Sequence, residues 1–252
     1  MLMILRRLKA HVEKENWFAV GIDFCIVVIG VFVGIQLGNW NEARQDKIAE
    51  AGYIERLDLE MDVIRARLTD GEAVYRNSVE NIDLLLDARR AFHRGEPDEI
   101  PDDDILQSAA SSVTSGRVPA GSPAAFKEMV ANGALETLRS EDLRQALFAY
   151  DEFSAVARDS WRTIREAQTW SANRVTGLID YDLNTDVAPA TSDIGDALRF
   201  ASFDRDLLLN DSDVKKALNI LIRTQINQQY IVAQQLALAN DIEVLLAEER
   251  AR

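Results

Sequence analysis

Residues 54–86 read IERLDLEMDVIRARLTDGEAVYRNSVENIDLLL, and the spacing of their apolar side chains predicts a helical fold. Apolar residues recur at intervals of three and four, with one interval of seven, which is typical of helices that pack side by side with a left-handed twist. Because the first proline is Pro97, we expect one helix to run to about Phe92, with a candidate bend at Asp70-Gly71. The apolar series comprises Ile54, Leu57, Met61, Ile64, Leu68, Tyr75, Val79, Ile82 and Leu86.

Towards the N-terminus, residues 17–40 read WFAVGIDFCIVVIGVFVGIQLGNW, and this stretch carries one formal charge, Asp23. A bilayer core about 30 Å thick needs roughly 20 apolar residues of helix. Trp17 and Trp40 would lie roughly 34 Å apart along a helix, and tryptophan prefers the headgroup level. We therefore predict a transmembrane helix with both tryptophans as interface anchors. No small-x-small cleavage site follows it, which favours an uncleaved anchor over a signal peptide.

The basic residues give a modest orientation signal. Residues 1–16 carry four basic residues, Arg6, Arg7, Lys9 and Lys14, and three more follow within sixteen residues of the span. The positive-inside rule then favours a cytoplasmic N-terminus and an extracytoplasmic domain over 41–252. For residues 1–16 two interpretations stay open: an amphipathic helix on the inner leaflet, or a frayed terminus whose charges set topology.

Three glycines, Gly30, Gly34 and Gly38, recur every four residues in the span. Such spacing lets helices approach closely in lipid, so it predicts self-association or docking of another membrane protein. Glycines that merely pack lipid are the alternative. The carboxylate of Asp23 must face protein, water or a cation, and either a partner contact or snorkelling to the interface would satisfy it. Cys25 is the one cysteine, so no intramolecular disulfide can form.

The remainder of the chain also has helical periodicity and almost no strand signal. Ser, Pro and Gly mark helix ends, because serine caps the first turn and glycine ends the last. We expect an all-α domain, an antiparallel four-helix bundle of three long helices and one broken one. After the first long helix, the expected helices are 103–113, Ser122-Pro123 to Gly133, a long one from Ser140, a short one near 193–201 within an irregular segment, and Asp211 to about Glu249.

Composition excludes several classes of function. The net charge is −14, and residues 41–252 hold 39 acidic and 24 basic residues, so nucleic acid would be repelled. The two histidines, His11 and His93, form no HExxH, ExxH or Ser-His-Asp pattern. We therefore predict no enzymatic activity, no metal and no cofactor.

Two weaker patterns have open interpretations. Asp180, Asp182, Asn184 and Asp186 alternate as calcium ligands do, but Thr185 and Thr191 stand where an EF-hand needs glycine and glutamate, so turn chemistry is favoured. The last helix carries six amides within eleven residues. They could form a buried polar layer that fixes register or lines a small-ligand pocket, or a polar face with one satisfied interior amide. These amides are Gln225, Asn227, Gln228, Gln229, Gln234 and Gln235.

Two blocks resemble a family of bacterial single-span membrane proteins to which no activity is assigned. The first is VVIGVFVGIQLGNWNEAR, similar to the family's IGILIALQINNWNEER-like stretch, and the second is SPAAFKEMVANGALETLRSEDLRQALFAYDEF. Asp151 replaces the second tyrosine of the family pattern. The resemblance implies an inner-membrane anchor and a helical periplasmic domain. The matching positions of the second block are Phe126, Gly133, Leu135, Leu138, Leu143, Leu147 and Tyr150.

Together these features favour a non-enzymatic, membrane-anchored interaction protein, such as an accessory subunit of an inner-membrane complex or a homo-oligomer. Its partners would be the lipid bilayer and a membrane protein, or a second copy, bound through the glycine face. The alternative is a periplasmic sensor or small-ligand-binding bundle that signals through a partner.

Overall fold

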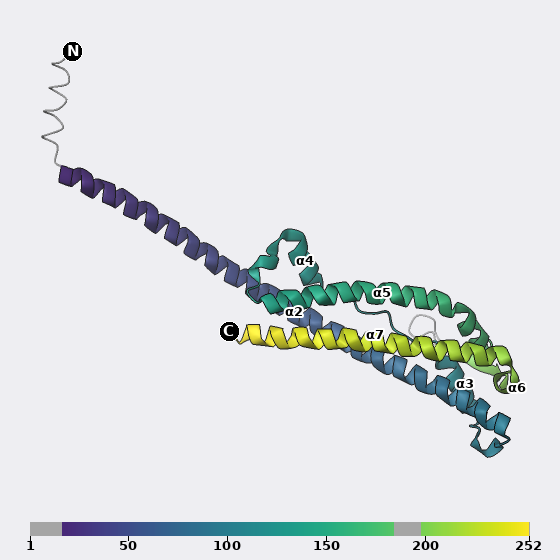
Figure 1. The fold of residues 1–252 in the computed structure, drawn as a ribbon. Helices are drawn as coiled ribbons and strands as arrows, with labels where there is room; N and C mark the ends of the chain where they lie inside the picture. The colour runs from purple at the N-terminus through teal and green to yellow at the C-terminus, as the bar shows by residue number, and fades with distance from the viewer. Residues whose placement is uncertain (1–16, 184–197, 252) are drawn as a thin grey trace, which may run out of the picture. The chain divides into compact units, whose positions relative to one another are not determined.

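The computed structural model describes residues 17–183 and 198–251, and it is helical almost throughout (Figure 1). Two compact units divide between residues 52 and 53, Met1–Gly52 and Tyr53–Arg252. We call the second unit the helical domain. The elements are α2 (Trp17–Arg94), the 3-10 helix η1 (Pro97–Glu99), α3 (Asp103–Ser112), α4 (Ala124–Asn132), the 3-10 helix η2 (Ala134–Thr137), α5 (Glu141–Thr176), β1 (Ile179–Leu183), β2 (Leu198–Phe203), α6 (Arg205–Asn210) and α7 (Ser212–Arg250).

The helical domain confirms the predicted fold class. Helix α2 from residue 53 onward, α5 and α7 are its three long helices, and α5 and α7 lie side by side in opposite directions (Figure 1). The broken fourth element is α3 followed by α4, which returns along α2. Residues 113–123 join α3 to α4 without helix, and we call them the connecting segment.

The interior consists of two apolar clusters. One packs Leu57 of α2 with Leu147 of α5 and Leu246 of α7. The other lies at the opposite end of the bundle and packs Ile82 and Val175 with other apolar residues. Of the predicted α2 series, only Val79 is not buried, because the adjacent Ser78 occupies the interior position. Buried polar side chains lie between the two clusters, among them Ser78, Gln225 and Gln228.

The helix ends test the predicted caps. Ser140 caps α5, since its hydroxyl accepts a hydrogen bond from the Leu143 amide at 3.1 Å, and Gly133 ends α4 with φ +74° in the left-handed region. The prediction that Ser122 caps α4 is wrong, because its hydroxyl donates to Asp151 instead. A carboxylate from α2, Glu60, accepts from the Ala125 amide at 3.0 Å and takes over that role.

The predicted helix near 193–201 is wrong for residues 198–201, which lie in β2; residues 193–197 lie outside the described residues. β1 and β2 pair antiparallel, with Tyr181 opposite Phe200 and Leu183 opposite Leu198. Apolar and charged residues alternate here with period two, which suits a strand. The four apolar side chains share one face of this hairpin, and all four are exposed.

Candidate functional site

The first candidate site is the membrane helix. Within the part of the chain that the structure describes, one helix has an apolar window long enough to cross a membrane, with mean hydropathy 2.1 and none of that window buried. A Cβ added to Gly30, Gly34 or Gly38 would meet nothing within 4 Å. Asp23, Cys25 and Trp40 are exposed as well. Trp17 begins α2, but its side chain lies outside what the structure describes.

Helical geometry places Asp23 on the glycine face. At about 100° per residue, Gly30 lies roughly 20° from Asp23 around the helix, and Gly34 lies roughly 20° to the other side. The acid and the glycines therefore lie along one side of the apolar span, with Ile26 and Val27 between Asp23 and Gly30. We call this side, from Asp23 to Gly38, the Asp-Gly face. Sequence analysis treated the acid and the glycines separately and missed their alignment.

The second candidate site was the amide series of α7, and most of its buried members bind the connecting segment. The Gln225 amide nitrogen donates to the carbonyl oxygens of Val113 at 2.8 Å and Ser115 at 3.2 Å. The Gln235 amide nitrogen donates to the carbonyl oxygen of Ala120 at 2.7 Å. These side chains are 2% and 0% exposed.

Helix α2 contributes two further donors from the opposite side. The Ser78 hydroxyl donates to the Val113 carbonyl at 2.9 Å, and the Tyr75 hydroxyl donates to the Arg117 carbonyl at 2.8 Å. A chain segment outside helix and sheet has no regular partners for its backbone groups, and buried carbonyls need donors. The polar residues between the apolar clusters therefore hold a non-helical segment inside a helical bundle.

Gln228 differs from its two neighbours in the series. It is 2% exposed, yet among the described residues neither its amide nitrogen nor its amide oxygen has a hydrogen-bond partner. Beside it lies a cavity of about 10 Å³, lined in part by Tyr75, Trp161 and Gln168. This volume holds about one water molecule, whereas small-molecule pockets measure roughly 300 Å³ or more. The cavity beside Gln228 is thus too small for an organic ligand. Asn227 and Gln234 are exposed, and Gln229 is half-buried.

The buried polar residues between the two apolar clusters form a polar layer, and two buried tyrosines belong to it. Burial raises the pKa of Tyr150 to about 12, although hydrogen bonds with Ser154 and Gln235 oppose the shift. Burial also raises the pKa of Tyr75. Both phenols stay protonated at neutral pH and act as structural hydrogen-bonding groups.

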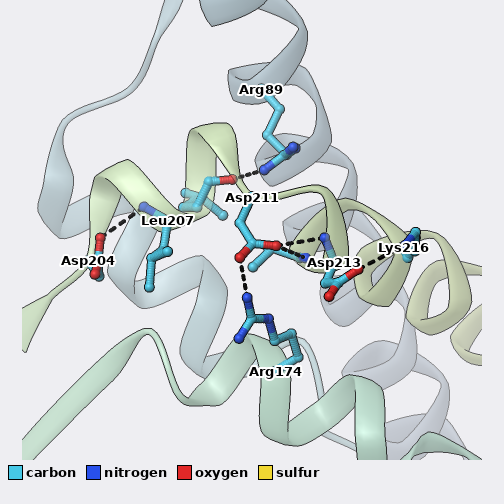
Figure 2. Close-up of polar contacts among 9 residues, drawn as sticks. Arg89, Arg174, Asp204, Leu207, Asp211, Asp213 and Lys216 are labelled. Carbon is cyan, nitrogen blue, oxygen red and sulfur yellow. Dashed lines mark hydrogen bonds and ion pairs between the residues drawn. The ribbon is translucent and has the colours of Figure 1, made fainter.

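A charged junction where α2, α5, α6 and α7 meet was missed by sequence analysis (Figure 2). Asp211 caps α7 by accepting from the amides of Asp213 at 2.6 Å and Val214 at 3.2 Å, and it also accepts from Arg174. The guanidinium of Arg89 donates to the Leu208 carbonyl. The one feature of this junction that could be predicted from the sequence is the start of the last helix at Asp211. The arginines could not be placed, because they come from distant parts of the chain.

The interactions of Asp211 at this junction should make the stability of the helical domain depend on pH. The backbone amides of Asp213 and Val214 lower the pKa of Asp211, and Arg174 adds to this effect. A carboxyl with a lowered folded-state pKa stabilises the fold fully above its ordinary value of about 3.9, and this stabilisation is lost as pH falls through the folded pKa. The Asp211→Asn variant should therefore lose less stability than the wild type between neutral pH and pH about 3. Urea unfolding across that pH range measures this, and superimposable pH profiles would contradict it.

The acidic series that begins at Asp180 lies only partly within the described residues. Among residues 17–183 and 198–251, no group of three His, Cys, Asp or Glu side chains could hold a metal ion. Asp180 accepts from the Ser202 hydroxyl at 2.7 Å across the hairpin, and Asp182 is exposed on β1. Asn184, Asp186 and Thr191 lie outside the described residues.

Comparison of the chain with protein-family models, curated proteins and solved structures found no match. The resemblance drawn from the two sequence blocks therefore stays a prediction.

Proposed function

We propose that this chain is a non-enzymatic, membrane-anchored interaction protein whose Asp-Gly face binds another membrane helix, from a partner protein or a second copy. The observation that carries the proposal is that Asp23, Gly30 and Gly34 share one face of an apolar helix that nothing in the described chain covers.

Two physical effects support this assignment. Small residues at intervals of four allow backbones to approach closely, and packing replaces the hydrophobic effect as the driving force within lipid. A carboxylate such as Asp23 is unfavourable in lipid unless it meets a cation, water or a hydrogen-bond donor. A partner helix that packs on the glycines would bring its own polar group to Asp23, so both features point to the same contact.

We further propose a placement for the rest of the chain. The basic residues before the span favour a cytoplasmic N-terminus, which puts the acidic helical domain in the periplasm of a bacterial inner membrane. The hairpin adds a second contact surface, because Tyr181, Leu183, Leu198 and Phe200 expose one apolar face. An accessory subunit of a membrane complex would use both surfaces.

Gly34→Ile tests the membrane contact. The added side chain should hold the helices apart and reduce recovery of the bound partner, or of the homo-oligomer, by about tenfold. The measurement is a mild-detergent pull-down of the tagged full-length protein, followed by mass spectrometry and native sizing.

Gly21→Ile is the matched control. Gly21 lies on the opposite side of the helix from Asp23, and an added Cβ there also meets nothing within 4 Å. The control should keep the wild-type assembly. Equal recovery from both variants, or a wild-type chain that purifies as a monomer without partners, would overturn the proposal.

A further inference from the structure

A groove in the helical domain lies apart from the polar layer and the membrane helix. It has a volume of about 530 Å³ and lies between the last turns of α2 and the first turns of α7. Four basic side chains and one histidine line it, together with Leu86 and Asn219. The five are Arg89, Arg90, His93, Arg94 and Lys215. We call this the basic groove.

The charged side chains that line the basic groove are opposite in sign to the net charge of the chain. No aspartate or glutamate belongs to its lining, although the chain holds 42 acidic and 28 basic residues. Acids do contact two of the arginines from outside: Asp83 and Asp87 bind Arg90, and Glu96 and Glu99 bind Arg94. These contacts use the Nε and Nη2 atoms of each guanidinium. A guanidinium has five donors, so each can still bind an anion.

The helix dipole does not explain the position of Lys215 in the basic groove. Basic residues in the last turn of a helix complement its dipole, which accounts for His93 and Arg94 in α2. Lys215 lies in the first turn of α7, where the dipole disfavours a positive charge. Within the described part of the chain, no carboxylate lies within ion-pair distance of its ammonium group.

Arg89 supplies a second, independent observation. It is 4% exposed, its Nε has no hydrogen-bond partner, and no carboxylate among the described residues forms an ion pair with it. Within the described part of the chain, its guanidinium donates a hydrogen bond to the Leu208 carbonyl (Figure 2). Buried charges are normally paired, because removing a charge from water is unfavourable. Burial lowers the pKa of Arg89, and the nearby carboxylate of Asp211 opposes this shift. An anion in the basic groove would add to the compensation that Asp211 provides.

We infer that the basic groove binds a small organic oxyanion, a phosphate or carboxylate group attached to an apolar body. Guanidinium and ammonium groups are the side chains that recognise such oxyanions. Leu86 and the aliphatic stems of the arginines would contact the apolar body, and the volume lies within the range of small-molecule sites. This site does not rest on the proposed membrane contact. It places a ligand-binding role at the junction of α2 with α7, outside the amide-rich interior.

Phenyl phosphate is a suitable probe, with the full-length protein in zwitterionic nanodiscs and binding followed by saturation-transfer NMR. Benzyl alcohol has a similar apolar body without charge, and it should bind at least about tenfold more weakly. Benzoate should also bind more tightly than benzyl alcohol, because it carries an oxyanion on the same kind of apolar body. Inorganic phosphate should bind more weakly than phenyl phosphate, and equal binding of the two would contradict the role of the apolar body.

Two adjacent lysines provide matched variants. Lys215 lines the groove, whereas Lys216 pairs with Asp213 at 2.8 Å. Lys215→Glu should weaken phenyl phosphate binding by about tenfold or more, and Lys216→Glu, with the same change in net charge, should change it by less than about twofold. Absence of binding up to about 10 mM, or equal losses in the two variants, would overturn the inference. Unchanged helix content of both variants by circular dichroism separates ligand loss from unfolding.

Discussion

Replacing Gln235 with leucine should lower the free energy of unfolding of the helical domain by about 3 kcal/mol. Its amide nitrogen donates to the Ala120 carbonyl at 2.7 Å and the Ser154 hydroxyl at 2.8 Å, and lies 3.3 Å from the Tyr150 hydroxyl. All of these contacts are buried, so leucine would leave the Ala120 carbonyl without a donor and without water. Urea unfolding followed by far-UV circular dichroism measures the change.

Gln228→Leu is the matched control for that experiment. Gln228 lies on the same helix and is equally inaccessible, but its amide has no partner. The same substitution there removes an unsatisfied polar group and should leave stability unchanged or raise it by about 1 kcal/mol. Two equal losses would show that helix packing, and not the bonds to the connecting segment, explains the role of these amides.

This comparison shows where sequence reasoning succeeded and where it could not. The long helices were predicted because their signals are local: the three-and-four spacing of α2, the cap at Ser140 and the stop at Gly133 each need only neighbouring residues. The α4 cap failed because its true acceptor, Glu60, comes from another helix. Local chemistry at Ser122 could not reveal that competition.

The same limit applies to the sites. The six amides of α7 were noticed, but their roles depend on where the carbonyls of the connecting segment lie, more than 100 residues away. The sequence indicated that some of the six amides lie inside but not which ones. It could not separate Gln225 and Gln235, whose nitrogens donate to the connecting segment, from Gln228, whose nitrogen and oxygen have no partner among the described residues. The basic groove needs the end of α2 to meet the start of α7, and no local motif encodes that meeting. The Asp-Gly face, by contrast, follows from helical geometry alone and could have been found.

Gly116→Ala should destabilise the helical domain by about 2 kcal/mol. Gly116 lies in the connecting segment against the buried ring of Tyr75, and an added Cβ would approach the ring carbon Cε1 to 2.9 Å and the hydroxyl to 3.0 Å. The ring is fixed on both sides, because Tyr75 is 2% exposed and its hydroxyl donates to the Arg117 carbonyl. Either the segment or the ring must shift, and a shift of either breaks that hydrogen bond. Thermal unfolding of the full-length protein, compared with the wild type, measures the loss.

Gly121→Ala, in the same segment, separates this contact from a general need for glycine. The nearest atom to an added Cβ there is Arg158 Nη1 at 3.7 Å, which is an ordinary van der Waals contact. Alanine restricts the unfolded chain more than glycine does, so this variant should be unchanged or more stable by about 0.5 kcal/mol. If both variants lose stability equally, backbone freedom of the connecting segment matters more than the fit of Tyr75. If only Gly116→Ala does, the close approach of segment and ring is what closes the interior between the two apolar clusters.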